Sequence, residues 1–546
     1  MKDIYNRIGI MFLSLSLLTT VACTKTKVSS DKKSNSSNSS ASSNISDVSS
    51  DEVASNEPEE IYSTETRLSA TGTIRAKTES SLKNIPANCA NLSNPLIGGY
   101  DKEADKRRKE ISSTENTETF YKISGQKYYI SAVGNDENDG TSPEKAFKSV
   151  NALDNVSLKA GDAVLFERDS VFRLVRSINC ISGVTYGSYG KGEKPKLYFS
   201  PKALNDPSLW TPTKKKNVWV AEFPYTQVAT IVFNHGSEIG YAKRKGLQQL
   251  ERNGAFYHNT EYGFLYLYCD KGNPGKVYSS VEASASGQIF YIDEESQNIV
   301  IDNICMKYSG NFAVNGSENT NGISITNCEM GYIGGANGYM GTVRYGNAVQ
   351  FWQGAMNLNV SNNWIYQTFD SAISWQGKAT AEKPAVYKNT VFDGNLLEYN
   401  NADFEFWDSD YASLDGLQIS NNIMRFTSLG WGTRSDDWGI RGIEGCIRID
   451  FQNMSRVKNV SIKNNIFDSA GRTIVMFIAN NYSQFNDTIV SGNSVYLKKS
   501  YRTQDDVIAG FNRSDADPEI LQATNQSELE KAFERFSKDT VVKWVD

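Results

Sequence analysis

A short unit that recurs along the second half of the chain constrains the fold more than any other feature. Its copies read IVIDNICM, ISITNCEM, LNVSNNWI, TVFDGNLL, LQISNNIM, VSIKNNIF and TIVSGNSV. Each copy alternates apolar and polar residues and then reaches a turn residue. The turn positions lie 24 to 43 residues apart and are Asn303, Asn327, Asn362, Gly394, Asn421, Asn464 and Gly492. A steady minimum spacing with a variable excess predicts one repeated strand unit that carries loops of different length.

The physical consequence of this repeat is a stack of coils. Short alternating strands cannot bury an apolar face alone, but stacked strands bury a continuous column. Asn and Gly tolerate the left-handed backbone of a sharp turn, and stacked Asn amides can hydrogen-bond along the column. We therefore predict an all-β fold, a right-handed parallel β-helix, with coils over residues 286–500. Five turn residues should lie near one line: Asn303, Asn327, Asn362, Asn421 and Asn464.

The segments around the coils have their own patterns. Residues 121–197 read as the start of the β-helix, with an N-terminal capping helix that begins at Ser142 and Pro143. Its apolar face would consist of Ala146, Phe147, Val150 and Leu153. Residues 198–285 predict a β-rich insertion. Residues 501–546 predict a C-terminal segment with a short helix, because Ser527 and Glu530 form a capping box before Leu529, Ala532, Phe533 and Phe536.

The N-terminus has the pattern of a targeting signal. Lys2 and Arg7 flank a short apolar run that ends at Cys23, so residues 1–22 predict a signal peptide. The last four residues of this run, TVAC, resemble the lipobox of bacterial lipoproteins, with Thr20 in place of the usual Leu. The resemblance implies lipidation of Cys23 and an extracellular body held at a bacterial cell membrane by a lipid anchor only. Secretion with an incidental cysteine is the alternative.

A low-complexity stretch follows the signal. Residues 23–120 are rich in Ser, Asn and acidic residues, which predicts a disordered tether. The run DKEADKRRKE, residues 101–110, is predicted to be a solvated part of that tether. A flexible arm would let the body reach a bulky substrate.

The coils and the segment before them resemble a known superfamily. YYISAVGNDENDGTSPEKAFKSV, GSYGKGEKPKL and ERNGAFYHNTEYGFLYLYCDKGNPGKVYSSVEAS are similar to segments of secreted carbohydrate-active proteins with the pectate-lyase-like right-handed parallel β-helix. The resemblance covers roughly residues 127–500. It implies the fold and leaves the activity open, because that superfamily contains lyases, hydrolases and non-catalytic proteins.

Composition narrows the chemistry. The chain has 546 residues, a net charge of −6 and two histidines, which disfavours nucleic-acid binding, a multi-histidine metal site and a Ser-His-Asp triad. The six cysteines after Cys23 have no zinc-site spacing. Acid–base chemistry should therefore fall to carboxylates, Lys, Arg or Tyr.

Alternation across four predicted strands places polar and aromatic residues on one outer face. In NAVQFW, SAISWQ, DFEFWD and CIRIDF, the apolar residues point inward, so the residues between them point outward. One predicted column contains Gln350, Ser374, Glu405 and Arg448, and the adjacent column contains Trp352, Gln376, Trp407 and Asp450. A one-residue register slip would bury Glu405 instead, and a costly lone buried carboxylate favours the exposed position.

Two further features are predicted to overhang this face. Asp370 lies at the turn that enters the SAISWQ strand, and LGWGTRSDDWGIRGIEG is the longest loop of the repeat. This loop contains Arg434, Asp436, Asp437, Trp438, Arg441 and Glu444. Aromatic rings stack on sugars and polar neighbours bind hydroxyls or carboxylates. The predicted substrate-binding residues are Gln350, Trp352, Gln376, Trp407 and Trp438.

Three functions are consistent with these residues. The first is a glycoside hydrolase with two carboxylates among Asp370, Glu405, Asp436 and Asp450. The second is a polysaccharide lyase, in which Arg448 or Arg434 acts as the base and acidic residues hold calcium. The third is a non-catalytic glycan-binding or adhesive protein. A solvated face with cross-strand ion pairs is the structural alternative. The hydrolase is favoured, as a monomer without a cofactor.

Overall fold

The computed structural model describes residues 96–242, 246–338, 343–434, 445–450, 454, 456–479, 487–501, 509–513, 519–521, 525–534, 537 and 539–545. The predicted signal peptide, lipidation at Cys23 and most of the predicted tether lie outside these residues. Within them, no helix has the length and apolar character needed to cross a bilayer.

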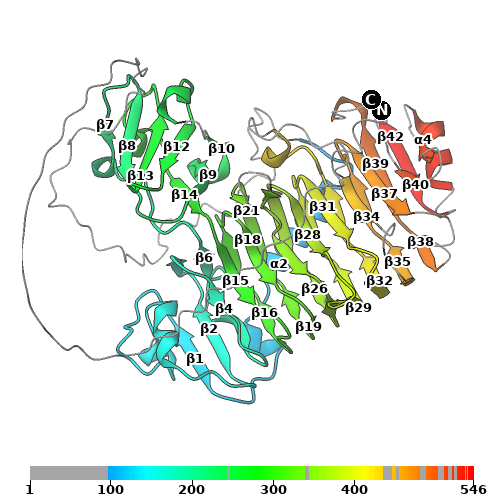
Figure 1. The fold of residues 1–546 in the computed structure, drawn as a ribbon, viewed down its shortest axis with the longest axis horizontal. Helices are drawn as coiled ribbons and strands as arrows, with labels where there is room; N and C mark the ends of the chain where they lie inside the picture. The colour runs from blue at the N-terminus through cyan, green and yellow to red at the C-terminus, as the bar shows by residue number, and fades with distance from the viewer. Residues whose placement is uncertain are drawn as a thin grey trace, which may run out of the picture. The chain divides into compact units, whose positions relative to one another are not determined.

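Three long sheets, made mainly of parallel strands, form the coils (Figure 1). We call them sheets 1, 2 and 3. Sheet 1 contains β1 (Lys127–Ile130), β2 (Ala163–Glu167), β5 (Thr185–Tyr189), β16 (Val300–Asp302), β20 (Ser324–Thr326), β26 (Asn359–Ser361), β29 (Ala385–Asp393), β32 (Ala412–Ser420), β35 (Arg456–Lys463) and β38 (Thr488–Ser491), with β19 (Thr320–Asn321) and β25 (Ala355–Met356) beside them.

Sheet 2 supplies the face on which the candidate residues lie. It contains β4 (Ile178–Asn179), β15 (Gln288–Ile292), β18 (Phe312–Gly316), β24 (Val349–Trp352), β28 (Ser371–Gln376), β31 (Ala402–Trp407), β34 (Gly445–Asp450), β37 (Thr473–Ala479), β40 (Ala509–Arg513) and β41 (Glu519–Leu521). Only the β40–β41 pair in this sheet is antiparallel among the described strands.

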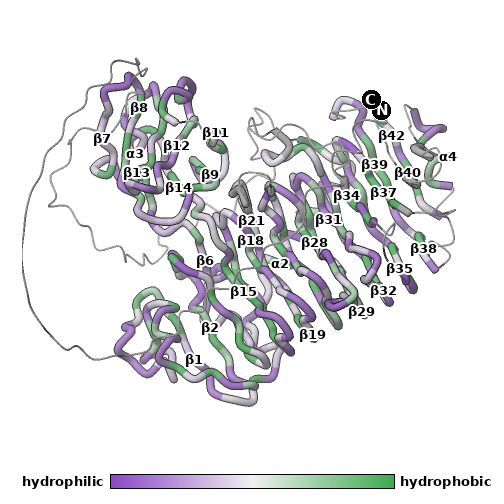
Figure 2. The backbone as a smooth tube through the Cα atoms, viewed as in Figure 1, coloured by the Kyte–Doolittle hydropathy of each residue, from purple (hydrophilic) through white to green (hydrophobic). Residues whose placement is uncertain are grey.

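Sheet 3 closes each coil. It contains β3 (Val171–Arg173), β6 (Lys196–Tyr198), β17 (Cys305–Lys307), β21 (Glu329–Ile333), β27 (Trp364–Thr368), β30 (Leu396–Glu398), β33 (Ile423–Arg425), β36 (Ile466–Asp468), β39 (Ser494–Lys498) and β42 (Val541–Val545). A short hairpin, β22 (Asn337–Gly338) and β23 (Val343–Arg344), lies outside the three sheets. Hydrophobic and hydrophilic stretches both occur along the coil strands (Figure 2). The predicted parallel β-helix fold is confirmed.

The predicted turn residues do lie at equivalent positions. Each directly follows a residue of sheet 1 that pairs in register with the next coil. All have a positive φ of 54° to 66°: Asn303, Asn327, Asn362, Gly394, Asn421, Asn464 and Gly492. This left-handed backbone is the reason that Asn and Gly recur there.

The amide ladder is formed by the residues one position later in the chain. Asn363 donates to the side-chain oxygen of Asn395, and the same bond continues to Asn422, Asn465 and Asn493 at 2.9–3.1 Å. These five side chains are buried, and each also donates to a backbone carbonyl on the other side. The ladder links successive coils inside the core.

The predicted capping helix is not an α-helix. Two 3-10 turns occupy its place, η3 (Pro143–Lys145) and η4 (Val150–Asn155). Phe147 lies between them, donates its N–H to Tyr129 and accepts from the N–H of Ser131. Because Phe147 uses its backbone groups in a bridge to the first strand, no helix can run through it.

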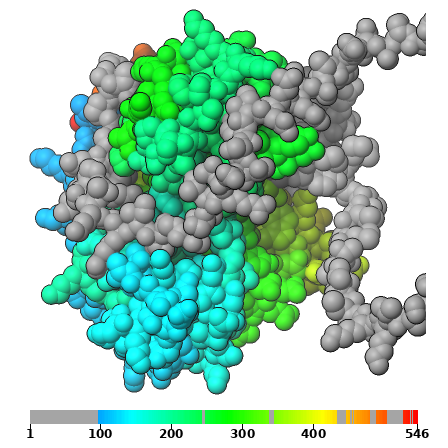
Figure 3. All heavy atoms as spheres, turned by 90° about the vertical axis from the view of Figure 1, so that its left-hand side faces the viewer, coloured from blue at the N-terminus to red at the C-terminus, as the bar shows by residue number. Residues whose placement is uncertain are grey.

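The insertion and the C-terminal segment have short elements of their own. The insertion contains an antiparallel sheet of β9 (Val228–Phe233), β10 (Glu238–Ile239) and β14 (Val281–Ala285). Its second sheet contains β7 (Thr211–Pro212), β8 (Val218–Glu222), β11 (Tyr241–Ala242), β12 (Ala255–Asn259) and β13 (Phe264–Tyr268). Its short helical turns are η5 (Pro207–Leu209), η6 (Asn234–Gly236), η7 (Leu247–Gln249) and α3 (Pro274–Val277). Figure 3 shows the insertion in green and the first strands in cyan.

Near the C-terminus lies helix α4 (Gln526–Glu534), which buries Leu529, Ala532 and Phe533. Its first turn is capped by Asn525, whose side-chain oxygen accepts the N–H of Glu528 at 3.1 Å. The predicted cap, Ser527, lies inside the helix instead. Other short 3-10 turns are η2 (Thr117–Thr119), η9 (Trp431–Arg434) and η11 (Lys499–Tyr501).

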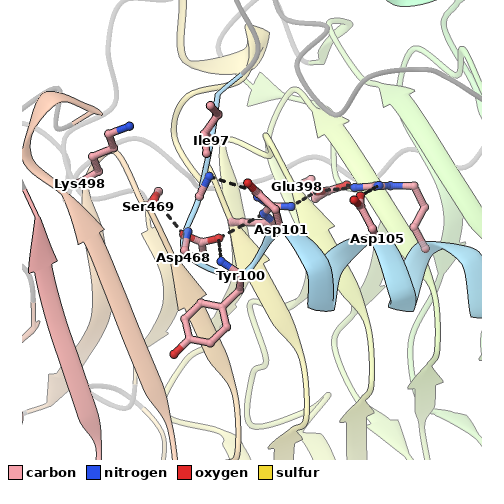
Figure 4. A network of polar contacts seen from close by, with 12 residues as sticks. Ile97, Tyr100, Asp101, Asp105, Glu398, Asp468, Ser469 and Lys498 are labelled. Carbon is pink, nitrogen blue, oxygen red and sulfur yellow. Dashed lines mark hydrogen bonds and ion pairs between the residues drawn. The ribbon is translucent and has the colours of Figure 1, made fainter.

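The last part of the predicted tether is folded. Residues 101–112 form helix α2 (Asp101–Ser112), which lies along the outer face of sheet 3 (Figure 4). Arg108 donates to both carboxylate oxygens of the buried Glu398 at 2.9 Å, and Asp468 accepts the N–H groups of Gly99 and Tyr100. The prediction that this charge run is solvated is therefore wrong. Its partners lie some 290 residues or more away in sequence, where the local pattern does not reveal them.

Candidate functional site

The predicted columns on the outer face of sheet 2 are present in register, but the predicted exposure of the first column is wrong for Gln350, Ser374 and Glu405, which are all buried. Gln350, Ser374, Glu405 and Arg448 pair in register across β24, β28, β31 and β34. Trp352, Gln376, Trp407 and Asp450 do the same two residues further along. The residues between them are fully buried in the coil core, which fixes the direction of both columns.

The predicted exposure of Glu405 is wrong. Its exposed fraction is 3%, although it points away from the core residues Phe404 and Phe406. Three donors surround its carboxylate: Arg448 Nη1 at 2.9 Å, Gln376 Nε2 at 3.0 Å and Ser371 Oγ at 3.2 Å. Alternation predicted the direction of the side chain correctly. Its burial is decided by neighbours on the adjacent coils, which the local pattern does not include.

A polar network continues from Glu405 toward the preceding coils. Ser371 donates its backbone N–H to Asn347 Oδ1 at 2.8 Å, and Asn347 Nδ2 donates to Gln350 Oε1 at 2.6 Å. Asn347 and Ser371 were missed from the sequence. Both lie at the corner that enters a sheet 2 strand, and an Asn or Ser at that corner in two successive coils was the available signal.

The two tryptophans of the second column meet above the strand between them. The ring centroids of Trp352 and Trp407 are 6.1 Å apart at an interplanar angle of 87°. Both rings are partly exposed, as are Gln376 and Asp450. An edge-to-face pair leaves aromatic faces available for a sugar ring, with an amide and a carboxylate on the same column.

Asp370 and the base of the long loop lie at the corner before β28. Asp370 is 4% exposed, and its backbone carbonyl accepts from Thr368 Oγ1 and from the N–H of Ala402. Trp431 packs on Phe369, with ring centroids 4.7 Å apart, and its indole N–H donates to the carbonyl of Gln367. Arg434 is the last residue of η9. Asp436, Asp437, Trp438, Arg441 and Glu444 lie outside the described residues.

A second buried carboxyl, missed from the sequence, lies on the same strand. Asp403 accepts hydrogen bonds from Asn400 Nδ2 and Thr427 Oγ1, and it has no exposed surface. Burial raises the pKa of Asp403 to about 8. Its surroundings are other buried side chains of the corner, so we interpret Asp403 as a structural residue.

Two other features bear on the location of a site. Within the part of the chain that the structure describes, no group of three or more His, Cys, Asp or Glu side chains is placed to hold a metal ion. A cavity of about 320 Å³ lies at the first coils, near η4 and β4. It is lined mainly by apolar residues, including Val150, Leu153, Leu158, Ile178 and Ile181, and offers no paired carboxylates.

Comparisons with known proteins return solved structures at low identity. No protein-family model matches this chain, and no curated protein matches it. Among solved structures, the complex of XylC with xylose has a TM-score of 0.39 at 10% identity, covering 76% of this chain and 83% of the other. A GH136 lacto-N-biosidase from Eubacterium ramulus has a TM-score of 0.39 at 12% identity, covering 77% and 68%. An alginate lyase from Paenibacillus sp. str. FPU-7 has a TM-score of 0.36 at 13% identity, covering 72% and 96%.

Proposed function

We propose that this protein is a carbohydrate-active enzyme that hydrolyses glycosidic bonds on the outer face of sheet 2. One observation carries the proposal: Glu405 lies at the centre of a polar network beside two partly exposed tryptophans and the partly exposed Asp450. Stacking surfaces, hydroxyl-binding groups and two carboxylates are what glycoside hydrolysis requires.

Two carboxylates of this face would divide the chemistry. Glu405 on β31 pairs with Arg448 on β34, and Asp450 lies two residues beyond Arg448. From strand spacing and rise, the Cα atoms of Glu405 and Asp450 are roughly 8 Å apart. Glu405 accepts bonds from a guanidinium, an amide and a hydroxyl, so it is suited to act as the carboxylate, either nucleophile or base. Asp450, which is partly exposed on the adjacent strand, would in this scheme be the group that holds a proton and delivers it to the leaving oxygen.

The contacts of Arg448 favour hydrolysis over the lyase mechanism. Arg448 Nη1 donates to Glu405 at 2.9 Å, so this nitrogen already serves as a donor, whereas a lyase base must accept a proton. A purely structural ion pair is the competing interpretation. A buried pair gives little net stability against apolar residues of similar size, so stability alone does not account for this one.

The cellular setting belongs to the same proposal. A lipid anchor at Cys23 would hold the body, as a monomer, on the outside of a bacterial cell, where polysaccharides are met. The lipobox-like sequence before Cys23 supports this location. Mass spectrometry of the protein from its host would detect a lipid on an N-terminal Cys23, and an unmodified Cys23 would contradict the anchor.

The enzymatic proposal is tested with the purified full chain. A panel of plant, algal and animal polysaccharides is incubated with the protein and with its Glu405→Gln variant. We expect new reducing ends with at least one polysaccharide, without the ultraviolet absorbance of unsaturated uronates. That absorbance, and its dependence on calcium, would instead support the lyase. Binding without any cleavage would support a glycan-binding protein.

A further inference from the structure

The orientation of one amide on the candidate face is fixed by its neighbour. Gln376 approaches Glu405 with its amide nitrogen, which donates to Oε2 at 3.0 Å. Glu405 already accepts from Arg448 and Ser371, so it offers only lone pairs to Gln376. An amide turned the other way would set two acceptors against each other. The amide oxygen of Gln376 is therefore directed away from Glu405.

The strand position of Gln376 gives this oxygen a particular setting. Gln376 pairs in register with Trp352 on one side and with Trp407 on the other. The two rings nevertheless approach to 6.1 Å, so they converge over the strand that carries Gln376. A sugar ring stacked on either tryptophan would therefore lie beside the strand position of Gln376, whose side chain is partly exposed.

We propose that the subsite formed by Trp352, Gln376 and Trp407 selects an uncharged sugar that donates a hydroxyl hydrogen to Gln376 Oε1. The inference rests on the proposed function and specifies its substrate class. Gln376 is then a specificity-determining residue, held in orientation by Glu405. The acceptor must be matched by a donor, and a sugar hydroxyl supplies one.

The charges around this subsite disfavour a uronate. A uronate carboxylate is an acceptor and would meet another acceptor here, Gln376 Oε1. Among the eight residues of the two columns, Arg448 is the basic one, and its Nη1 already donates to Glu405. Desolvating a carboxylate without a donor is costly, so a neutral ring has the better fit.

The test compares oligosaccharides that differ only in oxidation of C6, such as β-1,4-mannotetraose and its mannuronate counterpart, with equivalent gluco and galacto pairs. Binding to the full chain is measured by calorimetry at fixed salt. We expect a neutral member to bind at least 10-fold more tightly than its uronate. Gln376→Leu should weaken neutral binding about 3- to 10-fold, the range of one neutral hydrogen bond, with little effect on the uronate.

A second variant reverses the polarity of the subsite. Gln376→Lys keeps a donor for Glu405 and replaces the acceptor with a cation, so it should weaken neutral binding and strengthen uronate binding. The matched controls are Gln418→Leu and Gln418→Lys, which change an exposed glutamine on β32 of sheet 1. These controls should leave every affinity unchanged.

The outcomes separate this inference from the proposed function. Neutral binding that depends on Gln376 without cleavage supports the inference and overturns the hydrolase. Cleavage that depends on Glu405, combined with tighter binding of the uronate or no effect of Gln376→Leu, overturns the inference and leaves the hydrolase. Binding of no oligosaccharide overturns both.

Discussion

Replacing Asn422 by Ala removes the central rung of the amide ladder. Asn422 is fully buried and its side chain makes four hydrogen bonds. It donates to the carbonyl of Phe392 and to Asn465 Oδ1, and it accepts from the backbone and side-chain N–H groups of Asn395, all at 2.9–3.0 Å. The coils on both sides of β33 therefore lose a shared partner.

The size of the effect follows from the groups left behind. Asn395 Nδ2 keeps its bond to Val360, and Asn465 Oδ1 keeps the backbone N–H of Asn422. The backbone N–H of Asn395 loses its acceptor, Asn422 Oδ1, and the carbonyl of Phe392 loses its donor, Asn422 Nδ2. Two such buried groups cost about 1–3 kcal/mol each, so we expect a loss of about 3 kcal/mol or more.

Urea unfolding followed by tryptophan fluorescence measures this loss. The matched control is Asn421→Gly, one residue earlier, where φ is +54° and the side chain bonds Asp393 at the surface. Glycine accepts that backbone freely, so the control should change stability by less than about 1 kcal/mol. If Asn422→Ala costs no more than Asn421→Gly, the ladder does not stabilise the coils as argued.

Three further predictions concern other buried groups. Arg108→Glu should destabilise by about 3 kcal/mol in urea unfolding, because it puts a like charge against buried Glu398, while the exposed Lys109→Glu on the same helix should have little effect. Burial raises the pKa of Asp403 to about 8. The stability that this carboxyl contributes is therefore present below about pH 4 and lost as pH rises through 8. The melting temperature of Asp403→Asn, relative to that of the native protein, should be higher at pH 8 than at pH 5. Burial lowers the pKa of His258, whose Nδ1 accepts the N–H of Val228, so stability should fall below about pH 6.5, and His258→Gln should flatten that part of the melting curve.

The repeat predicted the coils well because its signal is local. Alternation within each strand and a left-handed Asn or Gly after it are set by neighbouring residues, so the turn positions and both columns of sheet 2 were predicted correctly. The ladder residues follow directly after those turns. Their role depends on facing an identical side chain one coil away, which a single repeat unit does not specify.

The predictions that were wrong each depended on a partner outside the local sequence pattern. Glu405 is buried against Arg448 and Ser371. Helix α2 is held on sheet 3 by contacts of its residues, and of the residues before it, with Glu398, Arg425 and Asp468. Phe147 forms a strand bridge to the first strand, so the expected capping helix is interrupted. For Glu405 and α2, the local pattern was correct about direction or charge, and a residue far away in sequence decided the outcome.

Turnover by Glu405→Gln tests the central claim most directly. Because Glu405 is buried and paired with Arg448, the variant should lose some stability, so rates are compared well below its melting temperature, after circular dichroism shows native structure. The double variant Glu405→Gln, Arg448→Gln controls for the unpaired cation. We predict that both variants lose cleavage of the best polysaccharide by 10²-fold or more while still binding it. A folded Glu405→Gln protein that cleaves at a rate within about threefold of the native rate would contradict the account, since that change corresponds to well under 1 kcal/mol of transition-state stabilisation.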